Sequence, residues 1–192
     1  MNVVDISAWQ ENMDWGGLLD AGVAGVIVKL GERNSMDDMF LQHIENAANY
    51  GLKIGIYYYA HAHSQYEAKE EAAWVADQVH QYFGDAGPEL GIWYDAEDDG
   101  MTCADVTATC SAFICYLNDA GFQYVGIYAS YNWLSNGTID MDSLADYVPY
   151  WVAQYYTENS LAAEKPDKNI KIWQYTDHLS DSLPYDGDLY YE

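Results

Sequence analysis

Basic residues are scarce in this sequence of 192 residues. Seven Lys and Arg stand against 31 Asp and Glu, which gives a formal net charge of −24 at pH 7. Proteins that bind duplex nucleic acid cluster Lys and Arg on one face to neutralise phosphates, and so acidic a chain can hardly assemble such a face. Anionic membranes are disfavoured for the same reason. The composition therefore excludes nucleic acid and membrane lipid as partners.

Long apolar runs are missing too. The longest, such as residues 22–30, have the length of a strand, well short of the roughly 20 residues that a membrane span needs. The chain starts at Met1 directly in a strand-like segment, without the basic segment and apolar stretch of a signal peptide. Such a start is typical of a cytosolic protein, a mature form, an excised domain or an enzyme released by lysis, and these alternatives stay open.

Cysteine is rare. The three thiols, Cys103, Cys110 and Cys115, all fall in one predicted helix. On a helix Cys103 and Cys110 are about 10 Å apart, too far for a disulfide, and Cys115 points in a different direction from Cys110. No His lies near them at metal-ligand spacing. We expect buried, unpaired thiols and neither a disulfide nor a zinc site.

Apolar and aromatic residues are abundant. Half of the residues are hydrophobic, enough for a sizeable core, and the length suits a single domain over residues 1–192. Nineteen Tyr, seven Trp and four Phe supply ring faces and, through Tyr, hydroxyl groups. Such side chains stack on sugars and hydrogen-bond to them. Most of them fill a core or a polar surface, so the composition only hints at a carbohydrate ligand.

Short apolar runs alternate with helical patterns along most of the chain. Strands are predicted at residues 3–6, 25–30, 53–59, 90–94 and 124–129. Helices are predicted at residues 15–21, 37–50, 64–82 and 104–120, with Ser64 and Glu67 as a capping box and Thr102 as an N-cap. Three further strands, separated by short or irregular segments, are predicted at residues 150–154, 170–175 and 188–190.

This order of elements predicts an α/β fold. Five strand–helix units followed by three strands, written (β/α)5(β)3, suggest a modified TIM-like barrel with parallel strands and right-handed crossovers. The main competitor is an open doubly wound sheet. That fold carries a glycine-rich phosphate loop after its first strand, where this chain has Asp-Ile-Ser-Ala-Trp at residues 5–9. The barrel is therefore favoured.

In a β/α barrel, the functional residues gather at the C-terminal ends of the strands. Acidic and aromatic residues dominate these ends here. The candidate site residues are Asp5, Lys29, Tyr57, Asp95, Glu97, Tyr128, Trp151, Gln154, Trp173 and Asp188.

Asp95 and Glu97 are the sharpest feature of this set. Residues two apart on a strand face the same side, with about 6.6 Å between their Cα atoms, so both carboxyl groups enter one pocket. Mutual repulsion then raises the pKa of one of them. An acid beside an anion is what cleavage of a glycosidic bond requires. The plainer alternative is an exposed acidic loop, because residues 95–99 contain four acids.

The other polar candidates have plain explanations as well. Asp5 and Asp188 each also suit a turn-capping role. Lys29 follows an apolar strand, where a lysine is costly unless it faces carboxylates, and this favours a role in the site. His61 and His63 are spaced like a pair of metal ligands, but no third ligand is evident. A polar rim or a simple loop is the preferred interpretation of the two histidines.

Together, several segments resemble the muramidases of glycoside hydrolase family 25, the bacterial and phage-type lysozymes. In chain order, the matching segments are residues 4–10 with Asp14 and Trp15, 26–29 with Glu32, 55–59, 95–97, 126–128, 150–155, 172–176 and 187–189. The resemblance spans essentially the whole chain. The chain departs from the family pattern at Tyr58, where the family has His, at Tyr190, where it has Asn, and in residues 180–186, which lack a glycine-rich turn.

The resemblance implies an eight-stranded barrel with about five helices that hydrolyses β-1,4 bonds from N-acetylmuramic acid to N-acetylglucosamine in peptidoglycan glycan strands. Glu97 would be the general acid and base, and Asp95 would stabilise the substrate's own N-acetyl group, with retention of configuration. Asp5 and Asp188 would line the floor. No cofactor or metal is implied, and we expect a monomer outside the cell or at the cell wall. Substrate contacts are expected from Lys29, Tyr57, Tyr128, Trp151, Gln154 and Trp173.

Two other functions stay open. A chitinase-like N-acetylhexosaminidase would use the same substrate assistance, but Ile92, Trp93 and Tyr94 stand where that family has further aspartates. A catalytically inactive barrel that binds the cell wall would not need the mutually repelling acids Asp95 and Glu97. The muramidase is the favoured interpretation.

Overall fold

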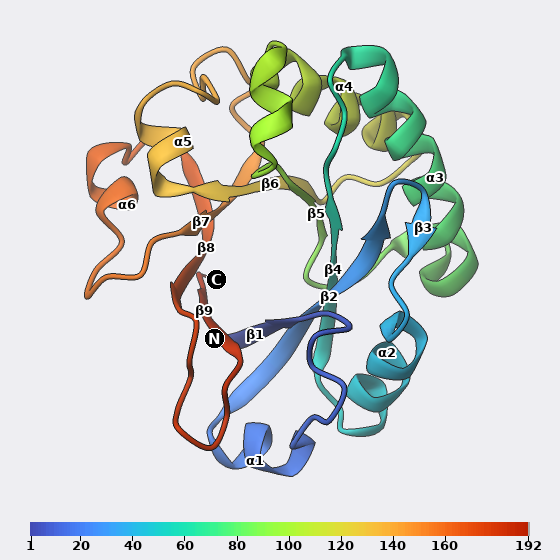
Figure 1. Ribbon diagram of the computed structural model, residues 1–192, viewed down its shortest axis with the longest axis vertical. Coiled ribbons are helices and arrows are strands. Elements are labelled where there is room, and N and C mark those ends of the chain that lie inside the picture. Colours follow the sequence, from blue (N-terminus) through green and yellow to red (C-terminus); the bar gives the residue numbers. More distant parts are fainter. Residues whose placement is uncertain (192) are drawn as a thin grey trace.

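The computed structural model describes residues 1–191, which form a β-barrel with helices around it (Figure 1). Its strands are β1 (Asn2–Ile6), β2 (Val23–Glu32), β3 (Ser35–Met36), β4 (Lys53–Tyr59), β5 (Ile92–Asp95), β6 (Val125–Ser130), β7 (Pro149–Ala153), β8 (Asn169–Thr176) and β9 (Asp186–Tyr190). Its α-helices are α1 (Trp15–Asp20), α2 (Phe40–Asn49), α3 (Gln65–Phe83), α4 (Val106–Asp119), α5 (Tyr131–Ser135) and α6 (Ser160–Glu164). Two short 3₁₀ helices are η1 (Gly84–Ala86) and η2 (Asp99–Cys103).

The sheet closes on itself because β1 and β2, at the two ends of the order β1-β9-β8-β7-β6-β5-β4-β2, pair with each other. Strand β3 only adds a hairpin to the end of β2. Neighbouring strands of the barrel are parallel except at β9, which runs antiparallel to both β1 and β8. The predicted eight-stranded α/β barrel is confirmed. Its last strand is reversed because residues 177–185 return the chain without a crossover helix.

The helices differ from the prediction in number and in one boundary. There are six α-helices rather than about five, since the five-residue α5 and α6 are too short to show a helical period. Helix α4 begins at Val106, where Asp105 Oδ1 accepts the Ala108 N–H at 3.0 Å, so Asp105 and not Thr102 is the N-cap. Within residues 1–191, no helix combines the length and apolarity that crossing a bilayer demands.

Because α4 begins at Val106, the three cysteines do not all lie in one helix. All three cysteines are free, as expected. Cys103 lies in η2 rather than in the helix, and both Cys103 and Cys115 are exposed, while Cys110 is buried. The expectation that all three fill a core was therefore wrong for two of them.

Large aromatic side chains fill the inside of the barrel. The inward-facing core consists of Val3, Ile27, Leu90, Trp93, Tyr128, Trp151 and Ile172. The Trp93 and Trp151 rings meet edge to face, with their centroids 5.9 Å apart. Because side chains alternate along a strand, Ile27 points inward while Val26 and Val28 belong to the larger core beneath the helices. The barrel is thus a solid support for the residues at its end.

Gly126 on β6 provides the space that the Trp93 ring occupies. A Cβ atom at this position would lie 2.4 Å from a Trp93 ring atom and 2.6 Å from the Pro149 carbonyl oxygen. We expect Gly126→Ala to lower the free energy of unfolding by about 1–3 kcal/mol, the usual cost of overpacking, as measured by urea denaturation. Gly16→Ala in α1 is the control, because its Cβ meets no atom closer than 3.7 Å. Equal stability of the two variants would contradict this account of the barrel interior.

Candidate active site

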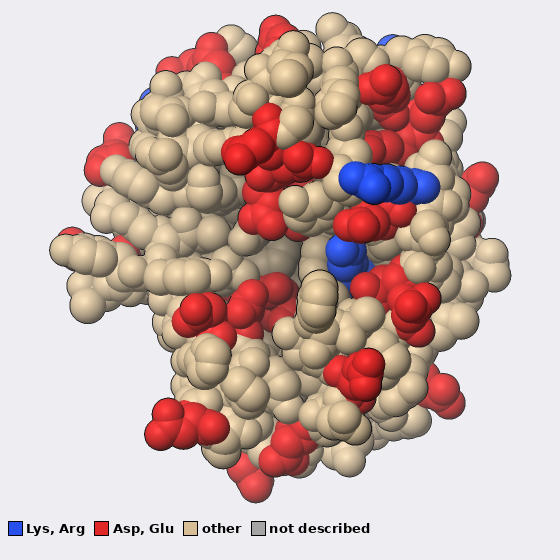
Figure 2. Space-filling model, viewed as in Figure 1, with Lys and Arg blue, Asp and Glu red and all other residues tan. Residues whose placement is uncertain are grey.

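A cavity of about 250 Å³ opens at the carboxyl ends of the barrel strands, where β/α barrels carry their function. It lies in the central hollow of the molecule, which acidic side chains border (Figure 2). The cavity is lined by Asp5, Ile6, Ser7, Trp9, Gln10, Lys29, Tyr57, Tyr59, Asp95, Glu97 and Asp186.

The register of the parallel strands brings several of these residues together. Lys29 on β2 lies beside Tyr57 on β4, and Tyr59 at the end of β4 lies beside Asp95 at the end of β5. Residues two apart on a strand face the same side, so Tyr57 and Tyr59 both reach the cavity. The structure therefore places Lys29, Tyr57 and Asp95 in one cavity wall.

Asp95 and Glu97 enter the cavity from the same segment of chain. Asp95 is 4% exposed, and its Oδ1 has no hydrogen-bond partner among the described residues. Burial, followed by the negative charges of Glu97 and Asp5, raises the pKa of Asp95 well above its usual range. Glu97 is accessible from solvent, while enclosure of its carboxyl group by the cavity walls raises its pKa. The two acids therefore differ: Asp95 is buried with an unpartnered oxygen, and Glu97 is accessible with a raised pKa.

Asp5 and Asp186 form the opposite side of the cavity. They lie directly across from each other in the antiparallel pair of β1 and β9. Gln174 bridges them, because its Nε2 donates to Asp5 Oδ2 at 2.8 Å and to Asp186 Oδ2 at 3.2 Å. The Gln174 Oε1 accepts the Tyr128 hydroxyl at 3.0 Å. Burial, together with the charge of Asp186, raises the pKa of Asp5 to about 7.

Asp188 and Trp151 lie beneath the cavity, inside the barrel. Asp188 is completely buried, and its Oδ1 accepts the Trp151 Nε1–H at 2.8 Å. Burial, followed by the charge of Asp5, raises the pKa of Asp188 well above its usual range. Asp186 therefore lines the cavity while Asp188 lies beneath it, and the Trp151 ring belongs to the barrel core. The functional roles expected of Asp188 and Trp151 stay predictions.

Gln154 and Trp173 also lie away from the cavity. On β8, Ile172 is buried in the barrel core, so its neighbour Trp173 points outward, where its Nε1 donates to the Gln154 carbonyl at 2.8 Å. The Gln154 side chain makes two hydrogen bonds to Ser160: its Nε2 donates to Ser160 Oγ, and its Oε1 accepts the Ser160 backbone N–H. The structure therefore places Gln154 and Trp173 outside the cavity wall, and a contact between them and the substrate stays a prediction. Tyr128 is 9% exposed and supports the cavity from below through Gln174.

Sequence reasoning missed Trp9, Gln10, Tyr59 and Asp186 as lining residues. Asp186 stands two residues before Asp188, so the spacing argument that paired Asp95 with Glu97 would have found it. Trp9 follows β1 in a turn that Gln10 stabilises by accepting the Ser7 N–H at 2.9 Å. Trp9 is 90% exposed, and an aromatic ring so open to solvent beside a cavity is a candidate platform on which a sugar could stack.

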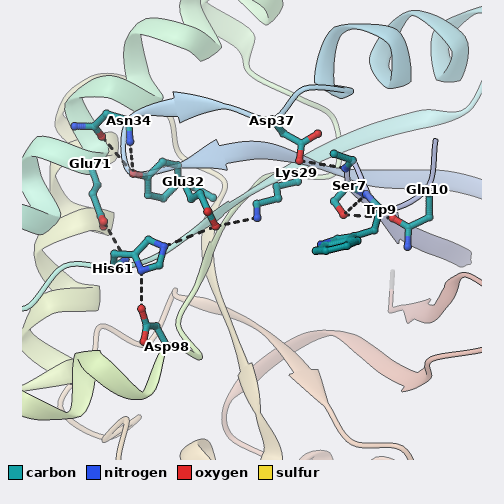
Figure 3. Close-up of polar contacts among 12 residues, drawn as sticks. Ser7, Trp9, Gln10, Lys29, Glu32, Asn34, Asp37, His61, Glu71 and Asp98 are labelled. Carbon is teal, nitrogen blue, oxygen red and sulfur yellow. Dashed lines mark hydrogen bonds and ion pairs between the residues drawn. The ribbon is translucent and has the colours of Figure 1, made fainter.

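A chain of polar contacts follows the rim of the cavity (Figure 3). Lys29 Nζ contacts Glu32 Oε2 at 3.0 Å, and His61 Nε2 approaches the same oxygen at 3.7 Å. The other ring nitrogen, His61 Nδ1, contacts Asp98 Oδ2 at 2.6 Å. The backbone N–H of His61 donates to Glu71 Oε1 at 3.0 Å. Within residues 1–191, no three His, Cys, Asp or Glu side chains are grouped to hold a metal ion. His61 therefore belongs to a polar rim.

Comparison with known sequences places the chain in a recognised group. A sequence model described as Glycosyl hydrolases family 25 matches residues 4–182. Lysozyme M1 of Streptomyces globisporus is 26% identical over 162 residues, which cover 79% of this chain and 54% of that protein. The chain therefore spans about half the length of this curated relative.

Solved structures share the fold. The modular autolysin LytC from Streptococcus pneumoniae superposes with a TM-score of 0.82 at 23% identity, over 99% of this chain and 46% of LytC. LytC has also been solved in complex with a synthetic peptidoglycan ligand. The muramidase from Trichobolus zukalii superposes with a TM-score of 0.80 at 24% identity, over 100% of this chain and 94% of that protein. At these identities the superpositions establish a common barrel.

The raised pKa of Asp5 predicts how stability depends on pH. An acid whose pKa is higher in the folded state than its usual value of 3.8 holds its proton more tightly when folded, so stability falls as the pH rises from about 4 to about 7. Asp5→Asn removes this loss. We expect the variant to melt at a higher temperature than the wild type at pH 8 and at nearly the same temperature at pH 4. Thermal unfolding followed by circular dichroism at both pH values measures this.

Asp20→Asn is the matched control, because Asp20 is an exposed acid at the end of α1. Its effect on the melting temperature should be the same at the two pH values. A pH-independent difference between Asp5→Asn and the wild type would contradict the burial argument.

Proposed function

Because the chain belongs to glycosyl hydrolases family 25, we propose that it is a peptidoglycan-degrading muramidase. It cleaves β-1,4 bonds between N-acetylmuramic acid and N-acetylglucosamine in bacterial glycan strands, outside the cell or at the cell wall. The observation that carries this proposal is the meeting of Asp95 and Glu97 in one cavity at the mouth of the barrel. The lysozyme, muramidase and autolysin among its relatives support the same substrate class.

Glu97 is the proton donor in this proposal. A general acid must reach the glycosidic oxygen and must hold its proton near neutral pH. Glu97 is the accessible member of the pair, and its raised pKa favours the protonated form. After the leaving sugar departs, the same carboxylate accepts a proton from water. Glu97 therefore acts first as an acid and then as a base.

Asp95 acts on the N-acetyl group of the substrate. Its buried Oδ1 lacks a hydrogen-bond donor, and a buried acceptor without a partner is costly until a ligand supplies one. The amide N–H of the 2-acetamido group is such a donor. This contact and the positive charge that develops on the sugar both favour ionised Asp95, which leaves the shared proton on Glu97.

The substrate supplies the nucleophile. The acetamido oxygen lies next to the sugar carbon within the same molecule, which gives it a large effective concentration. Its attack forms an oxazolinium ion whose charge Asp95 offsets. Water then opens this ring from the opposite face, so the configuration at the sugar carbon is retained.

Substitution of the two acids tests the assignment of roles. Glu97→Gln cannot donate a proton and should lose about 10³-fold in turnover, while Asp95→Asn still offers an oxygen to the amide and should lose less. Turbidity clearing of purified cell walls gives the rates, and mass analysis of the released sugars identifies the bond. Asp99→Asn, an exposed acid two residues further along, is the control and should keep wild-type activity. Cleavage of chitin oligomers in preference to peptidoglycan would favour a chitinase-like enzyme instead.

The anomer formed first tests the substrate-assisted step. Retention gives the β-anomer of the new reducing sugar, which mutarotates only later. Proton NMR of the earliest product should therefore show β before α. An initial α-anomer would mean direct displacement by water and would refute the assisted mechanism.

A further inference from the structure

A second cavity adjoins the catalytic one and shares Lys29 with it. It has a volume of about 290 Å³, and the β2–β3 hairpin forms part of its wall through Arg33 in the turn and Ser35 on β3. Arg33 is the single arginine of the chain. The face that carries the catalytic cavity shows basic side chains beside the central hollow, in a surface that is otherwise acidic (Figure 2).

The backbone at Arg33 is unusual. Arg33 and Asn34 have φ values of 49° and 56°, in the left-handed region that favours glycine. Two successive residues of this kind form the tight turn of the β2–β3 hairpin. Asn is common in this conformation, whereas a long side chain such as Arg is not. A residue that strains the backbone beside an active site suggests that its side chain has a function.

The hairpin is held firmly in this position. The Tyr58 hydroxyl accepts the Asn34 N–H at 3.0 Å and donates to Asn34 Oδ1 at 3.2 Å, and Tyr58 itself is fully buried. At Gly31 the two strands approach so closely that a Cβ atom would lie 2.0 Å from the Ser35 carbonyl oxygen. Arg33 therefore lines the second cavity from a fixed point of the hairpin.

Two of the three acids that line this cavity have partners, while the third, Asp38, is exposed and makes no ion pair with Arg33. Glu32 accepts Lys29 and approaches His61, and Asp37 accepts the backbone N–H groups of Ala8 and Met39. Within residues 1–191, no carboxylate lies within ion-pair distance of Arg33. An unpaired guanidinium presents a planar set of donors that matches a carboxylate.

We propose that Arg33 binds a carboxylate that the muramic acid residue carries, in the cavity beside the catalytic one. This carboxylate belongs either to the lactyl group of a bare glycan strand or to the peptide attached to it. The inference rests on the proposed function, and it makes Arg33 a determinant of specificity for muramic acid over neutral amino sugars. Lys29, which both cavities share, places the binding point next to Asp95 and Glu97.

Arg33→Gly is the variant that separates binding from folding. Glycine relieves the strained backbone, so the variant should melt at or above the wild-type temperature. On peptidoglycan we expect KM to rise about fivefold with kcat nearly unchanged, since a partly exposed charged contact is removed. Arg33→Lys should recover part of the loss. Lys69→Ala, which removes an exposed cation on α3, is the control for net charge and should leave KM unchanged.

Chemically modified substrates identify the carboxylate. On glycan strands whose carboxylates have been converted to amides, Arg33→Gly and the wild type should have the same KM. On strands stripped of peptide by an amidase, a persisting fivefold difference assigns the lactyl carboxylate, and its disappearance assigns the peptide. An unchanged KM for Arg33→Gly on untreated walls, or an equal defect on amidated strands, would overturn the proposal.

Binding measured without turnover separates this inference from the proposed function. N-acetylmuramic acid and N-acetylmuramoyl-dipeptide, titrated by protein-observed NMR, should bind the wild type more tightly than Arg33→Gly, while N-acetylglucosamine should not distinguish them. If the wild type binds in this way but hydrolyses no glycan, the proposed function fails and the inference stands. If it hydrolyses walls but neither muramic probe distinguishes the variants, the inference alone fails.

Discussion

The burial of three carboxyl groups at one end of the barrel is the constraint to which the neighbouring structure responds. Asp5, Asp95 and Asp188 are each at most 9% exposed, and charged carboxylates so enclosed are strongly disfavoured unless they are neutralised or hydrogen-bonded. Few cations are at hand in a chain with seven Lys and Arg. The protein instead surrounds these groups with neutral donors, chiefly Gln174 Nε2 and Trp151 Nε1. Burial, followed by the negative charges of neighbouring acids, nevertheless raises the pKa values of all three, because the neutral donors offset these effects only in part.

This compensation connects the barrel interior to the cavity. Trp151 packs against Trp93 in the core and also donates to Asp188, so one side chain serves both packing and polar satisfaction. Gln174, nearer the cavity, donates hydrogen bonds to both Asp5 and Asp186. Among the described residues, two of these buried acids keep an oxygen without a hydrogen-bond partner, Asp95 at Oδ1 and Asp188 at Oδ2. Of the two, Asp95 lines the cavity, where the proposed substrate would supply a donor. The unpartnered oxygen of Asp95 is therefore the one that a ligand in the cavity could satisfy, at a cost in stability that functional sites commonly carry.

The sequence predicted the barrel and the Asp95–Glu97 pair because strand periodicity and strand-end location are local properties of the chain. It did not resolve which face of a strand each side chain occupies. Trp173 lies next to the inward-facing Ile172, and neighbouring residues of a strand point to opposite faces of the sheet, so Trp173 points outward. Asp188 lies on the same face as Asp186, two residues further from the cavity. The reversal of β9 depends on the route of residues 177–185, which carry no periodic signal. Trp151 packs in the core against the Trp93 ring, which occupies the space that Gly126 leaves on β6, a tertiary effect that no local pattern reveals.

The distribution of charge accounts for how so acidic a protein could approach an anionic polymer. A net charge of −24 repels carboxylate-bearing glycans at long range. In about 0.15 M salt this repulsion is screened beyond roughly 8 Å, so contacts inside the cavity decide binding. There, Lys29 and Arg33 are the cations that line the two adjoining cavities. Under the proposal, the guanidinium of Arg33 supplies the local attraction for the carboxylate of muramic acid, and the acids that surround it repel anions that cannot reach this cation.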